Sequence, residues 1–234
     1  IGSQIFDYNA YTDAVKAMVG FIGRLKDAGI KVETLNMGGG FGIYYTDADP
    51  MFTPTRYSHI VKNLAKLVLE AVAEYDIEKP FLLIEPGRSI VGEAGITLYT
   101  VGTIKEIKDV RKYIAIDGGM FDNPRYALYG SKYTIINAGK ADKPYTQKVA
   151  LSGKCCESGD LIGVDMPLQD TEVGDIIAVF STGAYNYSMS SNYNMNAVPP
   201  MVLVKDGKAD FIVKPQTYDD LIRNMVVPDW LDKE

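Results

Sequence analysis

Three glycines, Gly38, Gly39 and Gly40, follow directly on a short predicted strand, residues 32–37. Glycine has no Cβ, so the backbone N–H groups of such a run can turn outward and approach an anion closely. The run therefore predicts a phosphate cradle, with a plain flexible turn as the alternative. It is neither the dinucleotide-binding fingerprint nor the nucleotide P-loop, because their glycine spacing and the Lys-Ser/Thr pair are absent.

A second polar group follows the next apolar segment, residues 81–84: Glu85, Pro86, Gly87 and Arg88. The carboxyl ends of parallel barrel strands carry the active site, so this carboxylate and guanidinium would face the same cavity as the glycine run. A structural ion pair at a strand end is the alternative. Because two strand ends carry such motifs, each strengthens the functional interpretation of the other, and we interpret both as functional.

Arg125 and Tyr129 lie four residues apart in a loop after an apolar segment. The planar fork of an arginine binds both oxygens of a carboxylate, so Arg125 is a candidate clamp for an acidic substrate group. An exposed loop arginine is the alternative. Further on, Tyr185 lies in a loop rich in tyrosine and asparagine. Its phenol could contact a phosphate or a ring in a pocket, and an ordinary tyrosine-rich surface is the alternative.

Cys155 and Cys156 are neighbours, and Glu157 follows them. Adjacent cysteines would form a strained disulfide ring, so we expect thiols in a reducing, cytoplasmic compartment. A thiol can donate a proton where its surroundings suit, and Cys155 has the alternative of a small buried side chain. With His59 the only histidine, the pair makes no zinc set, and we expect no metal.

The amino-terminal elements alternate between helix and strand. Apolar residues at three- and four-residue spacing predict helices at 8–29 and 55–75, and residues 32–37 and 81–84 read as strands. The run 81–84 is apolar throughout, as in a strand buried on both faces. Helix, strand, helix, strand predicts parallel pairing through crossover helices.

After residue 88 the texture changes to segments rich in Val, Ile, Thr and Tyr, at 96–107, 112–117, 132–137, 145–151, 175–181 and 201–213. Asp206-Gly207 predicts a hairpin turn, and a short helix is expected near 217–226. We therefore expect an α/β part over 1–88 and an antiparallel β domain over 89–234. An eight-unit barrel takes about 250 residues, so residues 1–88 would supply only its last third.

The composition limits the kinds of molecule that this protein is expected to bind. The 234 residues carry 24 basic and 30 acidic side chains, a net charge of −6, and no cluster of basic residues. A nucleic-acid or anionic-membrane surface is therefore disfavoured. No apolar run approaches the ~20 residues of a membrane span, and no signal peptide is visible. The chain begins with Ile1, so we expect an upstream barrel segment to be missing.

Taken in order, the motifs resemble the diaminopimelate decarboxylases, pyridoxal-phosphate enzymes with an alanine-racemase-type barrel. The resemblance covers essentially the whole chain and rests on six strings: Ile1 to Gln4, Gly38 to Gly42, Glu85 to Arg88, Asp117 to Tyr129, Cys156 to Asp160, and Gly183 to Tyr185. It implies the carboxyl-terminal part of a (β/α)8 barrel, followed by an antiparallel β-sandwich or barrel domain. It also implies a homodimer with active sites shared across the interface.

The resemblance also implies residue roles. Ser3 and the glycines, chiefly Gly39 and Gly40, would hold the phosphate of pyridoxal 5'-phosphate, and Glu85 would face its ring nitrogen. Arg88 would lie between phosphate and substrate, on the turn made by Pro86 and Gly87. The remaining roles concern an amino-acid substrate: Arg125 and Tyr129 for a carboxylate, Glu157 for the distal ammonium, Tyr185 for cofactor and substrate, and Cys156 as proton donor in the partner's site.

The family's Schiff-base lysine and a cofactor-stacking histidine would both precede residue 1. We therefore expect this chain alone not to decarboxylate meso-diaminopimelate to L-lysine. Two alternatives stay open: a decarboxylase of arginine, ornithine or a carboxylated polyamine, and a non-catalytic dimerisation module. Diaminopimelate carries both an ammonium and a carboxylate at its far end, which the pair Arg125 and Glu157 would match. An arginine there would repel a purely cationic end.

Overall fold

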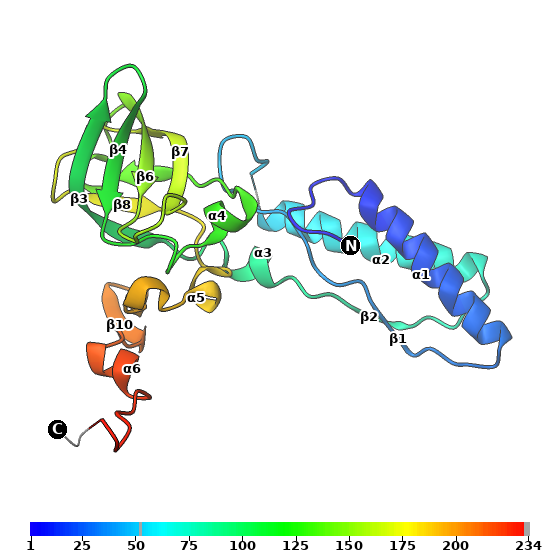
Figure 1. Ribbon diagram of the computed structural model, residues 1–234. Coiled ribbons are helices and arrows are strands. Elements are labelled where there is room, and N and C mark those ends of the chain that lie inside the picture. The colour runs from blue at the N-terminus through cyan, green and yellow to red at the C-terminus, as the bar shows by residue number, and fades with distance from the viewer. Residues whose placement is uncertain (52, 232–234) are drawn as a thin grey trace. The chain divides into compact units, whose positions relative to one another are not determined.

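The computed structural model describes residues 1–51 and 53–231, and the chain divides into two compact units. Unit 1 comprises Ile1–Ile96 and Phe180–Ala184, and unit 2 comprises Thr97–Val179 and Tyr185–Glu234. Figure 1 shows the elements of both, and each unit is described by itself. In the part of the chain described, no helix is long and apolar enough to cross a membrane.

Unit 1 contains the predicted alternation of helix and strand. Its elements are α1 (Asn9–Asp27), β1 (Thr34–Asn36), α2 (Pro54–Glu74), β2 (Phe81–Leu83) and the short α3 (Gly87–Val91). β1 and β2 pair in parallel, with Leu35 opposite Leu82. The start of α2 is fixed by Thr53, whose hydroxyl accepts a hydrogen bond from the Arg56 backbone N–H, as expected of a helix N-cap.

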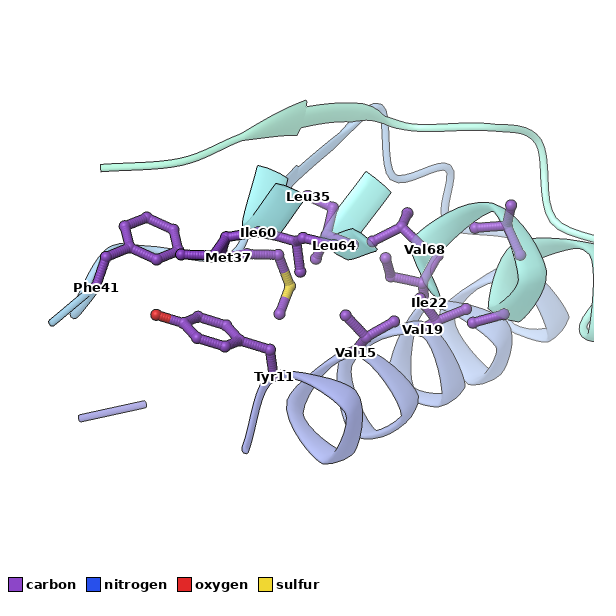
Figure 2. Close-up of a cluster of buried hydrophobic side chains, with 12 residues drawn as sticks. Tyr11, Val15, Val19, Ile22, Leu35, Met37, Phe41, Ile60, Leu64 and Val68 are labelled. Atoms are coloured by element: carbon purple, nitrogen blue, oxygen red, sulfur yellow. The ribbon is translucent and has the colours of Figure 1, made fainter. Parts of the chain in front are cut away.

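The core of unit 1 lies where α1 and α2 pack against one face of β1 and β2 (Figures 1 and 2). The apolar stripes of both helices meet there, as their periodicity predicts. The residues of this core labelled in Figure 2 are Tyr11, Val15, Val19, Ile22, Leu35, Met37, Phe41, Ile60, Leu64 and Val68. This packing fixes the carboxyl ends of β1 and β2, where the two polar motifs begin.

The expectation that residues 81–84 are buried on both faces is wrong for this chain. Leu82 and Ile84 pack against the core, whereas Phe81 is 72% and Leu83 41% exposed. Phe81 and Leu83 are exposed because, among the described residues, the helices cover only one face of the two-stranded sheet. An apolar run shows that a strand prefers burial on both faces, but not that the covering elements belong to the same chain.

Unit 2 is built on a six-stranded sheet in the order β5-β8-β3-β4-β6-β7. The strands are β3 (Thr97–Ile107), β4 (Arg111–Ile116), β5 (Ile135–Asn137), β6 (Gln147–Ser152), β7 (Leu161–Leu168) and β8 (Ile176–Val179). The sheet is mixed, because β4 and β6 pair in parallel while the other neighbours are antiparallel. The prediction of an antiparallel domain therefore holds for four of the five neighbouring strand pairs of this sheet and is wrong for β4 and β6.

The parallel pair has a physical cause in the connection between its strands. Parallel neighbours need a crossover of a dozen or more residues, and the chain between β4 and β6 supplies one through α4 (Arg125–Tyr129), β5 and η1 (Ala138–Lys140). β7 is a strand that the sequence reading missed, since Gly163, Asp165 and Pro167 interrupt its apolar pattern. Pro167 is tolerated because β7 lies at the edge of the sheet.

The end of the chain carries the predicted hairpin and short helix. β9 (Met201–Lys205) and β10 (Lys208–Val213) pair in antiparallel fashion around Asp206 and Gly207, both at positive φ as a tight hairpin turn requires. α6 (Tyr218–Ile222) follows, with Thr217 and Asp220 forming a capping box. Between the sheet and the hairpin lie α5 (Asn186–Met189) and η2 (Tyr193–Met195).

Candidate functional site

The glycine run and the Glu85 turn lie side by side at the carboxyl ends of β1 and β2. The Met37 N–H donates to the Leu83 carbonyl (3.0 Å), and the Glu85 N–H donates to the Gly38 carbonyl (2.7 Å). A Cβ on Gly39 would collide with the Glu85 carbonyl oxygen, so this close approach requires glycine. The packing of the two strand ends thus depends on the residue type at position 39.

Asn36, the last residue of β1, joins these two motifs through its side chain. Its Oδ1 accepts the Gly38 N–H at 2.8 Å, and its Nδ2 donates to the Glu85 Oε1 at 2.6 Å. The backbone N–H fixes which end of the amide is oxygen, so the other end can only donate. Asn36 therefore holds the Glu85 carboxylate as an acceptor. The only signal of this role in the sequence was its place just before the glycine run.

Ser3, Gln4 and Arg88 form the adjoining part of this surface. The Arg88 guanidinium donates to the Ser3 Oγ at 2.8 Å and to the Gln4 Oε1 at 3.0 Å. Gln4 is itself held by the backbone of Ile43. Pro86 precedes and Gly87 begins α3, whose first turn carries Arg88. Arg88 is thereby held beside the hydroxyl of Ser3.

The donors on this surface fit a phosphate group. In the part of the chain that the structure describes, the N–H groups of Gly39 and Gly40 make no backbone or side-chain hydrogen bond. The Tyr11 hydroxyl donates to the Gly39 carbonyl at 3.1 Å, and burial raises the pKa of Tyr11 to about 12. Free N–H groups beside a hydroxyl and a guanidinium are the donors that an anion of high charge density requires.

Arg125 is a buried residue of unit 2, only 6% exposed, so its reading as an exposed loop arginine is wrong. Its Nε donates to the Tyr133 hydroxyl at 3.0 Å. Its guanidinium carbon lies 5.7 Å from the ring centre of Tyr129 and 5.2 Å from that of Tyr185, within cation–π range. The structure therefore brings together Arg125, Tyr129 and Tyr185. Tyr185 has a φ of 73°, which is unusual outside glycine.

Cys156 and Glu157 form a separate group in unit 2, on the turn before β7. Cys156 is exposed, and its N–H donates to the Asn194 Oδ1 at 2.9 Å. Glu157 is exposed and accepts from the Tyr193 hydroxyl at 3.4 Å. The Gly159 N–H, followed by the hydroxyls of Ser158 and Tyr193, lowers the pKa of Glu157. Glu157 is thus an anion at neutral pH.

The two cysteines differ in their surroundings. Cys155 is half-buried, and burial followed by the neighbouring Asp160 charge raises the pKa of its thiol to about 11. It therefore stays a protonated thiol, while the Cys156 thiol faces outward. Both are free cysteines. Among the residues described, no group of three or more His, Cys, Asp or Glu side chains could hold a metal ion.

Comparison with known proteins assigns a family to this chain. A family model described as "Pyridoxal-dependent decarboxylase, C-terminal sheet domain" matches residues 8–183. Diaminopimelate decarboxylases of Halalkalibacterium halodurans and Bacillus subtilis are each 44% identical over 224 residues, 95% of this chain and 50% of theirs.

A solved M. jannaschii diaminopimelate decarboxylase in complex with L-lysine matches with a TM-score of 0.85 and 38% identity, over 99% of this chain and 51% of that one. The chain spans about half the length of the curated relatives it matches. A family model that covers 176 of 234 residues, together with relatives at this identity, establishes membership. The chain belongs to the pyridoxal-dependent decarboxylases.

Proposed function

We propose that this chain forms part of an enzyme that uses pyridoxal 5'-phosphate to decarboxylate meso-2,6-diaminopimelate, giving L-lysine and CO2. The observation that carries the proposal is the likeness, over 95% of the chain, to proteins named diaminopimelate decarboxylases. The L-lysine held by the M. jannaschii relative is the product of that reaction. The charges and hydrogen-bond donors of both units suit this reaction.

The surface at the ends of β1 and β2 supplies what the cofactor needs. The free N–H groups of Gly39 and Gly40, with the Ser3 hydroxyl, would hold the phosphate, and the Arg88 guanidinium would contact both the phosphate and the substrate. The Glu85 carboxylate, to which the Asn36 Nδ2 donates at 2.6 Å, would bind the ring nitrogen of the cofactor. When bound, the cofactor acts as the electron sink of the reaction, and a carboxylate at the ring nitrogen keeps that sink effective.

The substrate groups are matched by opposite charges in unit 2. Arg125 binds a substrate carboxylate through its fork, beside the hydroxyl of Tyr129 and the ring of Tyr185. Glu157, an anion at neutral pH, binds the distal ammonium. A substrate with only a positive group at its far end would meet the Arg125 cation there, so the pair favours diaminopimelate over ornithine or arginine.

Cys156 donates the proton that replaces the departing carboxylate. The bond between Cα and the carboxyl carbon breaks, CO2 leaves, and the electron pair left behind forms a C–H bond with the thiol proton. The resulting thiolate is reprotonated by solvent. The side chains of Cys156 and Glu157 are exposed in this chain, which supports their reaching the site of a second copy in a homodimer.

The same proposal extends to the fold. Residues 1–88 are part of a (β/α)8 barrel and residues 89–234 form the carboxyl-terminal β domain. The exposed Phe81 and Leu83 support a barrel, because parallel strands are normally covered on both faces. Two free neighbouring thiols support a cytoplasmic location, where cysteines stay reduced.

The direct test is to load the complete enzyme with pyridoxal phosphate, supply meso-diaminopimelate and measure L-lysine and CO2. Turnover of diaminopimelate in preference to ornithine and arginine is expected. Absence of lysine formation with bound cofactor would reject the proposal.

Cys156→Ala should lower kcat with little change in KM, while Cys155→Ala, whose thiol faces Asp160, should have little effect.

Arg125→Ala tests the substrate assignment. Loss of a charged hydrogen bond to a carboxylate should cost about 1.5–3 kcal/mol, or roughly ten- to hundredfold in kcat/KM for diaminopimelate. Arg223→Ala, an exposed arginine at the end of α6, is the matched control and should leave kcat/KM unchanged. Equal rates for Arg125→Ala and wild type would instead favour a substrate without a distal carboxylate.

A complementation experiment tests the shared site. Cys156→Ala and Glu85→Gln chains are mixed under conditions that allow subunit exchange. If Cys156 acts in the partner's site, each mixed dimer contains one intact site, and about a quarter of wild-type activity should return. If Cys156 acts beside the Glu85 of its own chain, no mixed dimer has an intact site, and no activity returns.

A further inference from the structure

Asp160 is a buried carboxylate, 3% exposed, at the base of the turn that carries Cys156 and Glu157. Its Oδ1 accepts the Met120 N–H at 2.6 Å, and its Oδ2 accepts the Cys155 N–H at 2.7 Å. Its own backbone N–H and carbonyl bond to the Glu157 carbonyl (3.1 Å) and the Gly153 N–H (2.9 Å). One side chain thus joins the turn over residues 153–160 to the loop after β4.

The space around this carboxylate is shaped to admit it. A Cβ on Gly119 or on Gly153 would collide with its oxygens, so two glycines from the two joined segments leave room for the group. Among the described residues, Asp160 forms no ion pair with an Arg or Lys. A buried charge with no cation partner is costly unless N–H donors satisfy it, and here two backbone N–H groups do so.

The arrangement requires a carboxylate rather than any polar group of the same shape. Each of the two oxygens faces a backbone N–H. An asparagine of equal size would turn its NH2 group toward one of these donors, and two donors facing each other cannot form a hydrogen bond. The neighbouring Asp122 differs, because its Oδ1 accepts the Gly119 N–H (2.6 Å) and its Oδ2 faces the Tyr99 hydroxyl, which can also accept.

We propose that Asp160 is a positioning residue, whose two oxygens hold the Cys156 and Glu157 turn against the loop of Met120. The functional consequence rests on the proposed function, because the turn carries the proton donor and the ammonium-binding carboxylate of that reaction. The structural claim does not depend on it. Tyr193 and Asn194 also bond to the turn, and the Lys154 N–H donates to the Gly118 carbonyl at 3.1 Å. Among the described residues, removal of the Asp160 side chain therefore leaves the turn joined to the loop after β4 by this one backbone hydrogen bond.

The structural arm measures backbone amide exchange by NMR in Asp160→Asn, with Asp122→Asn as the matched control. In Asp160→Asn the Met120 or Cys155 amide, whichever meets the NH2 group, should exchange at least about tenfold faster. In Asp122→Asn both amides should keep their protection. Unchanged exchange in Asp160→Asn would overturn the proposal. So would equal loss at β4 and β6 amides such as Ile114 and Val149, because Asp160 would then support the sheet rather than the turn.

The functional arm is a double-mutant cycle in the active, cofactor-loaded enzyme. Asp160→Asn should lower kcat by at least about tenfold and also raise KM, because the turn carries Glu157 as well as Cys156. Combined with Cys156→Ala it should add much less than it costs alone, because a residue that acts through Cys156 has nothing left to position. Full additivity would overturn the positioning role. Absence of turnover in the wild-type enzyme would reject the proposed function and leave the exchange result standing.

Discussion

Asp122 places a carboxyl group in the interior of unit 2, where it is 5% exposed. Burial, the largest cause, and the neighbouring Asp160 charge together raise the pKa of Asp122 to about 6, against the hydrogen bonds from Tyr99 and Gly119, which lower it. The folded pKa lies above the ordinary value of 3.8, so the folded chain takes up this proton at a higher pH than the unfolded chain. The stability that comes with this proton is fully present below pH 3.8 and is lost as the pH rises through 6.

This linkage predicts how Asp122→Asn changes the pH dependence of stability. Between pH 7.5 and pH 5 the wild-type chain should gain about 1–1.5 kcal/mol of unfolding free energy relative to the variant, which cannot titrate. The variant should fold, since its amide can accept from Gly119 and donate to the Tyr99 oxygen. Urea unfolding of both proteins at the two pH values measures the difference. Parallel pH profiles would contradict the burial argument.

At the scale of elements, the junction of β1 and β2 depends on two glycines in different ways. Gly38 has a φ of 70° and open space around it, so Gly38→Ala should cost only the strain of a left-handed residue, about 1–2 kcal/mol. Gly39→Ala drives a Cβ into the Glu85 carbonyl and must separate the strand ends, so its cost should exceed roughly 3 kcal/mol. Denaturant unfolding of the pair measures this, and equal losses would contradict the close approach.

The packing of α2 predicts a second contrast, between two leucines of the same helix. Leu64 is 2% exposed in the core of unit 1, whereas Leu69 is 46% exposed. Leu64→Ala should therefore cost about 2–5 kcal/mol of unfolding free energy. Leu69→Ala removes a side chain that stays largely in water and should cost less than about 1 kcal/mol. Similar losses for both would mean that Leu69 is buried in solution.

The periodicity of α1 and α2 was sufficient to predict these elements, because a stripe such as Ile60, Leu64 and Val68 is a local signal. The Asp206-Gly207 turn was predicted from an equally local signal. β7 was missed because Gly163, Asp165 and Pro167 break its pattern, and a strand that tolerates them does so through its position at the sheet edge. The parallel pairing of β4 and β6 also lay beyond local pattern, since it depends on the path of a 30-residue connection.

The residues of the candidate site also fall into two groups: those that the sequence alone reveals and those whose role only the fold reveals. Residues that do chemistry by type, such as Arg88, Arg125 and Cys156, are visible in the sequence. Asn36 and Asp160 act through the backbone N–H groups that the fold brings to them, which residue type alone does not reveal. Burial of Arg125 was likewise unpredictable, because it depends on Tyr133 and on rings that come from two separate segments.

At the scale of the whole molecule, the sheets of the described chain differ greatly in how far their strands are buried. The six-stranded sheet buries β6 and β8, whereas β9 and β10 form a separate two-stranded hairpin (Figure 1). Apolar hairpin side chains such as Val204 and Phe211 are 71% and 59% exposed. The segment that flanks the hairpin is tied back through Gln216, which bonds to Val198 (2.8 Å) and Asn192 (2.6 Å).

An isolated two-stranded hairpin is marginally stable in water, so the hairpin should open without unfolding of the larger sheet. Amide exchange by NMR should show protection factors in β9 and β10 at least about a hundredfold below those in β4 and β6. Gln216→Ala should lower hairpin protection further, because it removes the acceptor for the Val198 N–H and the Asn192 amide, while β6 protection stays unchanged. Equal protection in both sheets would mean that the hairpin opens only with the core, and its exposed apolar side chains would then need a covering surface.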